Sequence, residues 1–211
     1  MVMGSLNERR MEDRHSTFDY LRKHYREETD YRIRFENRGG RFLIFAPHGG
    51  GIERGTSELV SGIAGNDLSY YLFESRLPTA RESQALHVTS TRFDEPECLK
   101  LIKGFQTSLA IHGCVGREPM IHVGGRDDEL KNALVIKLRR KGYPVQFGTR
   151  EYAGSFSTNI CNRTNSRKGV QLEFSNGFRR ILFEDWRTRQ SRKTTTALFS
   201  RLVSDIREVL E

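Results

Sequence analysis

The sequence predicts an α/β fold: a single domain with a mixed, mostly parallel sheet and helices on both of its faces. Apolar runs of strand length, such as residues 42–46 and 107–113, alternate along the chain with segments of helical periodicity. The chain has 211 residues, of which 36% are hydrophobic, so it can bury a sizeable core. No Pro- or Ser-rich linker interrupts it. We therefore expect one compact domain over residues 30–211, preceded by a polar, partly helical segment at 1–29.

In the first half of the chain, the predicted elements have clear boundary signals. The apolar run before Pro47 is typical of a buried strand, and Pro47 should end it because proline has no N–H to donate to a ladder. Thr56 is the predicted N-cap of the next helix, and Pro96 occupies the first position of another. The predicted helices here cover 16–28, 56–64 and 96–104, and the predicted strands cover 42–46, 69–74 and 85–90.

The second half of the chain continues the alternation. Leu130, Leu134 and Leu138 recur at four-residue spacing, and Gly142 supplies the C-cap of that helix. Between residues 169 and 175 apolar side chains alternate with polar ones, as in a strand with one buried face. The predicted strands here cover 107–113, 119–123, 143–148 and 169–175, and the predicted helices cover 127–141 and 194–210.

A glycine-rich loop after the first strand carries the strongest functional signal. His48 comes directly after the apolar run, and Gly49, Gly50 and Gly51 let the backbone turn so that Glu53 returns beside it. An imidazole and a carboxylate placed this way are typical metal ligands. The alternatives are an ordinary strand-to-helix loop with a surface histidine, or a phosphate-binding loop, although a carboxylate at this position repels phosphate.

His112 repeats this arrangement, because it also ends an apolar strand and precedes a glycine. In a parallel or mixed sheet the ends of the two strands converge on one edge, where α/β folds bind ligands. Two histidines and one glutamate make a catalytic zinc set with an open position for water. A hydrogen-bonded core histidine is the alternative for His112.

Glu173 is the best remaining candidate for a general base. It lies on the polar face of the strand at 169–175, and a zinc-bound water needs a nearby carboxylate that is not itself a ligand. The alternative is a solvated carboxylate on an edge strand. His87 and His122 also lie in predicted strands; we interpret them as core or surface histidines, with a role near the metal as the alternative.

At this point the chain resembles the phage-type poly-γ-glutamate hydrolases, zinc peptidases whose fold is akin to that of the carboxypeptidase A group. The combination of APHGGGIERGTSE (46–58), NICNRT (159–164) and GVQLEFS (169–175) is distinctive, and matching segments cover most of residues 30–185. The same family also carries the name of a phage replication protein, which implies no mechanism.

The resemblance implies a carboxypeptidase-like fold and a zinc cofactor held by His48, Glu53 and His112, with Glu173 as the general base. In the wider carboxypeptidase group two residues separate the His and Glu of the first motif, whereas four separate them here. A glycine-rich loop can absorb the longer path.

Four residues are candidates for binding the substrate. In the wider group an Asn-Arg pair that grips the substrate's carboxylate precedes the second zinc histidine, whereas here Asn162 and Arg163 follow it. Arg163 can offer a bidentate fork to a carboxylate with Asn159 and Asn162 beside it, and the alternative is an ordinary polar loop. Arg92 is either a further substrate contact or one half of a structural ion pair with Asp94.

The charge of the chain indicates an anionic partner. Its formal net charge is +8, and nine Lys/Arg stand against three Asp/Glu over residues 163–193. Nucleic acid is the usual partner of such a run, but no zinc finger, helix-turn-helix signature or RNP-like aromatic pattern accompanies it. A polycarboxylate polymer satisfies the same electrostatics. An ordinary solvated basic face is the alternative, above all after Trp186.

The cysteines and the amino terminus bear on location. Cys98, Cys114 and Cys161 are an odd number in a chain too long to need disulfides, which favours a reducing compartment. Cys114 shares the strand face of the preceding histidine, and we interpret it as a packing residue near the site. There is no apolar signal segment and no run of membrane length. We expect a cytoplasmic monomer without membrane contact, released by host lysis if it is phage-derived.

Three functions follow from these residues. The first is a zinc-dependent hydrolase that cleaves the γ-glutamyl amide bonds of poly-γ-glutamate. The alternative within enzymes is a zinc carboxypeptidase or N-acyl amino acid deacylase acting on a small substrate. The third is a basic, replication-associated nucleic-acid-binding protein in which the histidines are structural. Stoichiometric zinc separates the enzymes from the binding protein.

Overall fold

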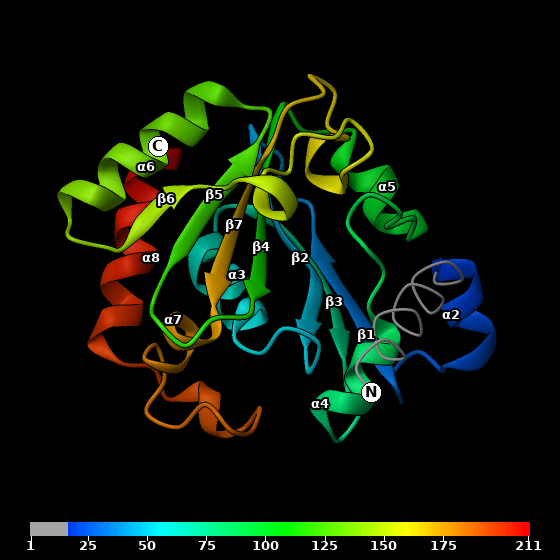
Figure 1. Ribbon diagram of the computed structural model, residues 1–211. Helices are drawn as coiled ribbons and strands as arrows, with labels where there is room; N and C mark the ends of the chain where they lie inside the picture. The colour runs from blue at the N-terminus through cyan, green and yellow to red at the C-terminus, as the bar shows by residue number, and fades with distance from the viewer. Residues whose placement is uncertain (1–16) are drawn as a thin grey trace, which may run out of the picture.

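A single seven-stranded sheet organises the computed structural model, which describes residues 17–211 (Figure 1). The strand order is β1-β3-β2-β4-β7-β5-β6. The four central strands β3, β2, β4 and β7 are parallel, whereas β1 and β5 pair antiparallel with their neighbours and β6 pairs parallel with β5. The strands are β1 (Tyr31–Glu36), β2 (Phe42–Gly50), β3 (Ser69–Ser75), β4 (Thr107–Cys114), β5 (Ile121–Gly125), β6 (Val145–Phe147) and β7 (Val170–Ser175).

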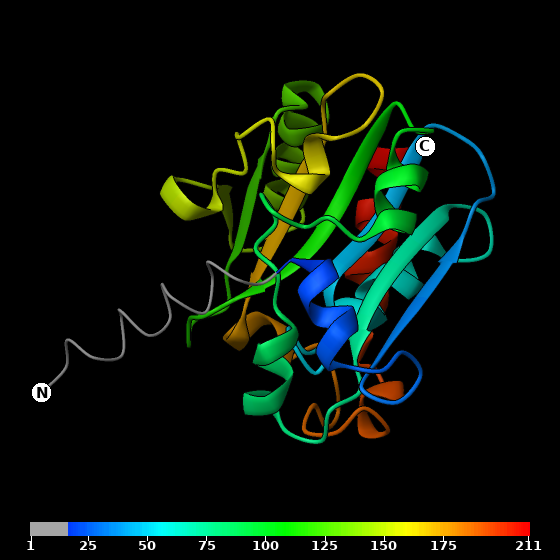
Figure 2. The ribbon, with the colours of Figure 1, turned by 90° about the vertical axis from the view of Figure 1, so that its right-hand side faces the viewer.

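Helices and loops cover both faces of this sheet, as Figure 2 shows from the side. Alternate residues of each strand face opposite cores, so Ile44 and Leu109 pack with α3, α6 and α8, whereas Phe45 and Ala110 pack with α2 and α5. The α-helices are α2 (Phe18–His24), α3 (Thr56–Ala64), α4 (Ala80–Ser83), α5 (Pro96–Ile102), α6 (Asp128–Arg140), α7 (Asn176–Arg180) and α8 (Ala197–Leu210). Four 3₁₀ turns are η1 (Gln84–Leu86), η2 (Arg150–Tyr152), η3 (Ile160–Asn162) and η4 (Ser191–Lys193).

This architecture confirms the predicted fold class. Each of the five predicted helices overlaps a helix of the structure, and six of the seven predicted strands are present. Of the predicted N-terminal segment 1–29, residues 1–16 lie outside the described residues. In the part of the chain that the structure describes, no helix is both long enough and apolar enough to cross a bilayer.

The strand predicted at 85–90 is wrong, and β1 was not predicted. Leu86 and Val88 are buried, but neither lies in a strand. Leu86 ends a 3₁₀ turn, and Val88 lies in an extended segment that pairs with no strand of the sheet. Periodicity reports which side chains are buried and not which backbone they pair with. The segment YRIRFE of β1 alternates basic and apolar side chains on the edge of the sheet, and its burial decreases from Tyr31 to Glu36 on both faces.

Two predicted boundaries also need correction. Pro47 does not end its strand: β2 continues to Gly50, and the register with β3 shifts between Ala46 and Gly49, so the proline sits in a bulge where no ladder N–H is needed. Thr56 is not an N-cap either. That position is held by Gly55, while the Thr56 hydroxyl donates to the carbonyl of Glu53 at 2.8 Å.

The buried carboxylate of Glu74 on β3 binds arginines from β1 and from the C-terminal region. Glu74, 1% exposed, lies opposite Gly49 in the β2–β3 register and accepts hydrogen bonds from Arg34 (2.8 Å) and Arg189 (3.2 Å), with Arg32 at 3.5 Å. Burial alone would raise the pKa of Glu74, but the hydrogen bond and charge of Arg34, with the charge of Arg189, lower it below its ordinary value.

We expect Glu74→Gln to destabilise the protein near neutral pH by at most the ~3–5 kcal/mol that breaking a buried ion pair costs, since the arginines keep contact with water. Because the folded pKa of Glu74 is lowered, this stabilisation is present above the ordinary Glu pKa and is lost as pH falls through the folded pKa. Urea unfolding at pH 7 and at acidic pH checks this. The gap between wild type and variant should shrink with acid, whereas Glu36→Gln, on the exposed side of β1, should show little effect at either pH.

Some basic side chains of the run at 163–193 form ion pairs within the protein. Arg192 is buried and donates to Glu58 at 2.8 Å, and Arg187 donates to Asp185 at 2.9 Å. These partners neutralise part of the charge that the sequence counts, so the run overstates the cationic surface available to a polyanion.

Candidate metal centre

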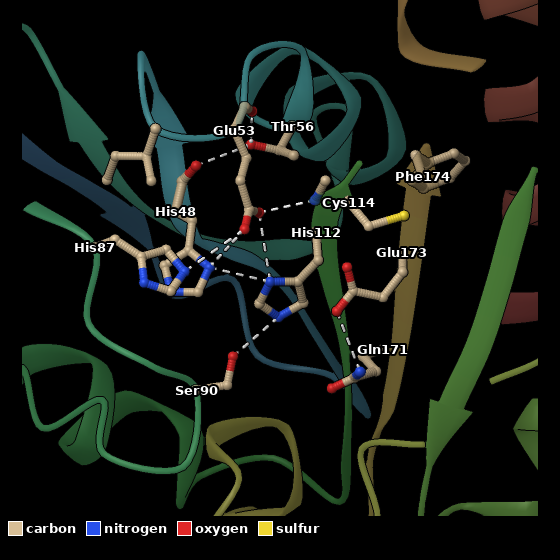
Figure 3. A network of polar contacts seen from close by, with 12 residues as sticks. His48, Glu53, Thr56, His87, Ser90, His112, Cys114, Gln171, Glu173 and Phe174 are labelled. Atoms are coloured by element: carbon tan, nitrogen blue, oxygen red, sulfur yellow. Dashed lines mark hydrogen bonds and ion pairs between the residues drawn. The ribbon is translucent and has the colours of Figure 1, made fainter. Parts of the chain in front are cut away.

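Two buried histidines face each other across β2 and β4. The two strands pair in parallel only as far as Phe45 and Ala110, and the site histidines follow this point on each strand. His48 and His112 are each 2% exposed, with their Nδ1 atoms 3.2 Å apart (Figure 3). Their rings are tilted by 59° with centroids 5.0 Å apart. The two histidines that the sequence paired are therefore in contact.

Glu53 returns to both histidines through the glycine loop. Gly50 has a φ of +66°, which turns the chain, and the N–H of Glu53 donates to the carbonyl of His48 at 3.0 Å. Its Oε1 lies 3.0 Å from His48 Nδ1, its Oε2 lies 3.5 Å from His112 Nδ1, and the N–H of Gly113 donates to Oε2 at 2.8 Å. Burial opposes charge on this group, but the two imidazoles lower the pKa of Glu53 well below its ordinary value.

The hydrogen bond on the far side of His48 determines which atom is available to a ligand. Its Nε2 donates to the carbonyl of Val88 at 2.7 Å, which leaves Nδ1 as the lone-pair nitrogen of the neutral ring. That lone pair points at His112 Nδ1, 3.2 Å away, and at Oε1 of Glu53, 3.0 Å away. Nitrogen and carboxylate donors that converge in this way fit a divalent cation such as zinc.

His87 is a fourth group at the same place, one that sequence reasoning left unassigned. Its Nε2 lies 3.9 Å from Glu53 Oε1, and ligand atoms of His48, Glu53 and His87 all lie within 4.8 Å of one another. Burial, and then the charge of His48, lower the pKa of His87 to about 3, so the ring is neutral. It stacks on His48 with centroids 4.0 Å apart and planes 30° apart. The structure therefore offers two imidazoles, His87 and His112, as partners of His48 and Glu53.

Glu173 stands beside the histidines on the neighbouring strand. It is the register partner of His112 on β7, and the two side chains project from the same face of the sheet (Figure 3). Burial is the main reason that the pKa of Glu173 is raised, and the charge of Glu53 adds to it. A carboxyl with a raised pKa close to a metal centre has the chemistry of a general acid or base. β7 is a central strand, so the solvated-edge alternative is wrong.

The four predicted substrate contacts are in different situations. Asn162 is buried and donates to the carbonyls of Gly154 (2.7 Å) and Phe156 (2.9 Å), which occupies its amide group. The guanidinium of Arg163 donates to the carbonyls of Thr158 and Phe93. Asn159 contacts Gln171. Arg92 is exposed on a turn.

Asp94, the alternative ion-pair partner of Arg92, also has a backbone contact. Asp94 Oδ1 accepts the N–H of Phe18 at 2.6 Å, at the start of α2. The role of Arg92 and Arg163 at the substrate stays a prediction, whereas the hydrogen bonds of Asn162 are those of a residue that shapes its own loop.

Arg179 is a structural contributor that the sequence did not reveal. It is buried and donates to the carbonyls of Phe174, Arg54 and Cys114, so it ties the metal loop to the ends of β4 and β7. Gly113 makes room for it, because a Cβ there would lie 2.4 Å from the guanidinium carbon. The only local sequence signal for this close packing was the glycine that follows His112, as another follows His48.

The cysteines are free and buried. Burial raises the pKa of the Cys114 thiol to about 11, so it stays protonated at neutral pH. This agrees with its interpretation as a packing residue.

Comparison with known proteins gives concordant matches. A family model described as poly-gamma-glutamate hydrolase matches residues 15–205. UPF0714 protein YmaC of Bacillus subtilis (strain 168) is 37% identical over 202 residues, which cover 94% of this chain and 84% of YmaC. UPF0714 protein YndL of the same strain is 36% identical over 185 residues, covering 87% and 72%.

Solved structures agree with these matches. A bacteriophage poly-gamma-glutamate hydrolase superposes with a TM-score of 0.89 at 33% identity, covering 94% of this chain and 96% of that one. A zinc-free apo form of YndL superposes with a TM-score of 0.88 at 33% identity, covering 94% and 97%.

Proposed function

This chain belongs to the poly-γ-glutamate hydrolase family, and from that premise we propose that it cleaves the γ-glutamyl amide bonds of poly-γ-glutamate with zinc held by His48, Glu53 and His112. The observation that carries the proposal is the convergence of two imidazole Nδ1 atoms and one carboxylate in a buried space. Such a set leaves a coordination position open for water or substrate.

The side chains around this site have complementary roles in amide hydrolysis. A bound zinc ion supplies Lewis acidity at the scissile carbonyl. Glu173 accepts a proton from the attacking water and delivers it to the nitrogen of the leaving amine. Val88 holds His48 in the tautomer that presents Nδ1, and Gly113 orients Glu53 through its N–H. The buried Arg179 keeps the ends of the strands that carry these groups together.

The substrate is a linear polycarboxylate, which suits the positive charge of the chain. A net charge of +8 attracts a polyanion over a range of about 8 Å at physiological salt. Family membership favours this substrate over a small N-acyl amino acid. It also favours hydrolysis over nucleic-acid binding, although a cationic surface alone would suit both polymers.

Metal removal on matched polymers tests the proposal. We expect the purified protein to contain about one zinc per chain, as one His₂Glu set holds, and to shorten γ-linked polyglutamate but not the α-linked polymer of the same charge. Chelation should abolish cleavage, and one equivalent of zinc should restore it. New amino groups and polymer size report cleavage, and elemental analysis reports zinc.

The α-linked polymer is the control, because it presents the same carboxylates in a different backbone. Full activity after chelation would refute zinc dependence. Turnover of an N-acetyl amino acid with no cleavage of γ-polyglutamate would favour the small-substrate alternative, and tight DNA binding without zinc or hydrolysis would favour the third function.

A further inference from the structure

A buried chain of three polar side chains leads away from the metal centre. Glu173 and Gln171 project from the same face of β7, and Asn159 stands at the start of η3 behind them. Asn159 Nδ2 donates to Gln171 Oε1 at 2.9 Å. Gln171 Nε2 donates to Glu173 Oε1 at 3.3 Å, as Figure 3 shows. Asn159 is 5% exposed and Gln171 is 2% exposed, so their bond to each other is shielded from water, whereas the bond to the half-buried Glu173 is shielded in part.

The direction of every bond in this chain follows from one backbone amide. The N–H of Cys161 can only donate, and it donates to Asn159 Oδ1 at 3.1 Å. The Asn159 amide must therefore present its NH₂ to Gln171, which turns the Gln171 oxygen toward Asn159 and its own NH₂ outward. The two N–H groups of Gln171 then serve two acceptors, Glu173 Oε1 and the carbonyl of Tyr152, each at 3.3 Å.

We propose that Gln171, oriented by Asn159, is a positioning residue for Glu173 and that Asn159 acts on the reaction only through it. This inference rests on the proposed function of Glu173 as general base. A buried carboxylate without a donor is costly and free to rotate, whereas a hydrogen bond to a charged acceptor stabilises the charge and limits the orientation. The arrangement also assigns Asn159 a place behind the base rather than in contact with substrate.

Asn159→Asp tests the direction of the chain. Aspartate has the same shape and still accepts from Cys161, but its second oxygen then faces the oxygen of Gln171. The Gln171 amide is expected to reverse and present its oxygen to Glu173. We expect kcat on γ-polyglutamate to fall about 10–100-fold, the range for loss of an outer-shell partner, while KM and zinc affinity stay within about twofold.

Gln171→Met keeps the bulk and removes the donor, so it should also lower kcat, and it keeps the proposal testable if Asn159→Asp fails to fold. The double variant gives the most discriminating comparison. Because Gln171→Met leaves no Gln171 amide that could reverse, Asn159→Asp should add little to its effect on kcat. Thr164→Val is the matched control: it removes a buried hydrogen bond to Lys168 from the same loop, at 2.7 Å, and should lower Tm without changing kcat.

Three results would overturn the proposal. The first is an equal loss of kcat from Asn159→Asp in the wild-type and in the Gln171→Met background. The second is a raised KM at unchanged kcat, which indicates direct contact with substrate. The third is wild-type kinetics in both single variants. Glu173→Gln is measured beside them. If that variant stays active, the proposed role of Glu173 fails; if it is inactive while the Asn159 and Gln171 variants match wild type, only the positioning role fails.

Discussion

Replacing His112 with Ala is expected to remove bound zinc and hydrolytic activity together. Its Nδ1 lies 3.2 Å from His48 Nδ1 and 3.5 Å from Glu53 Oε2, so its loss removes one of the three proposed ligands. Zinc should be held far more weakly, by more than the ~10–100-fold that loss of an outer-shell partner costs. Competition with a chromophoric chelator measures the affinity, and activity on γ-polyglutamate should fall to background.

His87→Ala is the comparison that makes this result informative, because both imidazoles are buried within reach of Glu53. His87 stacks on His48 and is neutral, so its loss should leave about one zinc per chain, as a His₂Glu set holds. If His87→Ala lost its zinc while His112→Ala kept it, the ligand set would be His48, Glu53 and His87 instead.

Glu173→Gln is expected to keep zinc and substrate affinity and to lose most of kcat. Glutamine has the size and hydrogen-bonding outline of glutamate but cannot accept the proton of the attacking water. A general base contributes about 10²–10⁴-fold in rate, and this loss should appear in kcat with KM nearly unchanged. Steady-state kinetics together with metal analysis of the same preparation measure both parts.

The zinc content of that variant decides how its inactivity is interpreted. An inactive Glu173→Gln protein that has lost its zinc would make Glu173 a ligand, and Glu53 would become the candidate base. Glu53 is the less suited of the two as base, because the imidazoles lower its pKa, whereas burial raises that of Glu173. A variant with wild-type kcat would remove Glu173 from the mechanism.

Local signals in the sequence were enough to locate four of the α-helices, α3, α5, α6 and α8. The proline at the start of α5 and the leucine spacing of α6 act within a few residues, whereas the predicted cap of α3 was wrong and the short helices α4 and α7 were not predicted. The metal loop is local in the same way. Glu53 reaches His48 through a turn with four residues between them, and the three glycines among these predict such a turn from the sequence.

Strand pairing lay beyond those signals. The segment around Val88 has the sequence pattern of a strand, but it pairs with no strand, and the carbonyl of Val88 accepts a hydrogen bond from His48. Pro47 has the sequence signal of a strand end, but β2 continues beyond it: the proline lies in a bulge, and pairing with β3 resumes at Gly49. In both cases the outcome depends on which backbone lies alongside, and residues distant in the chain decide that.

The sequence by itself determined that two histidines and two glutamates follow or lie in apolar strands, because hydrophobic periodicity and glycine are properties of short segments. Only the tertiary structure decided that β4 and β7 are neighbours in parallel register, which places Glu173 beside His112, and that Asn159 reaches Gln171 behind it. It also brought His87 into the site. Side chains meet across a sheet according to strand order and register, and these are set by the packing of the whole core rather than by any segment alone.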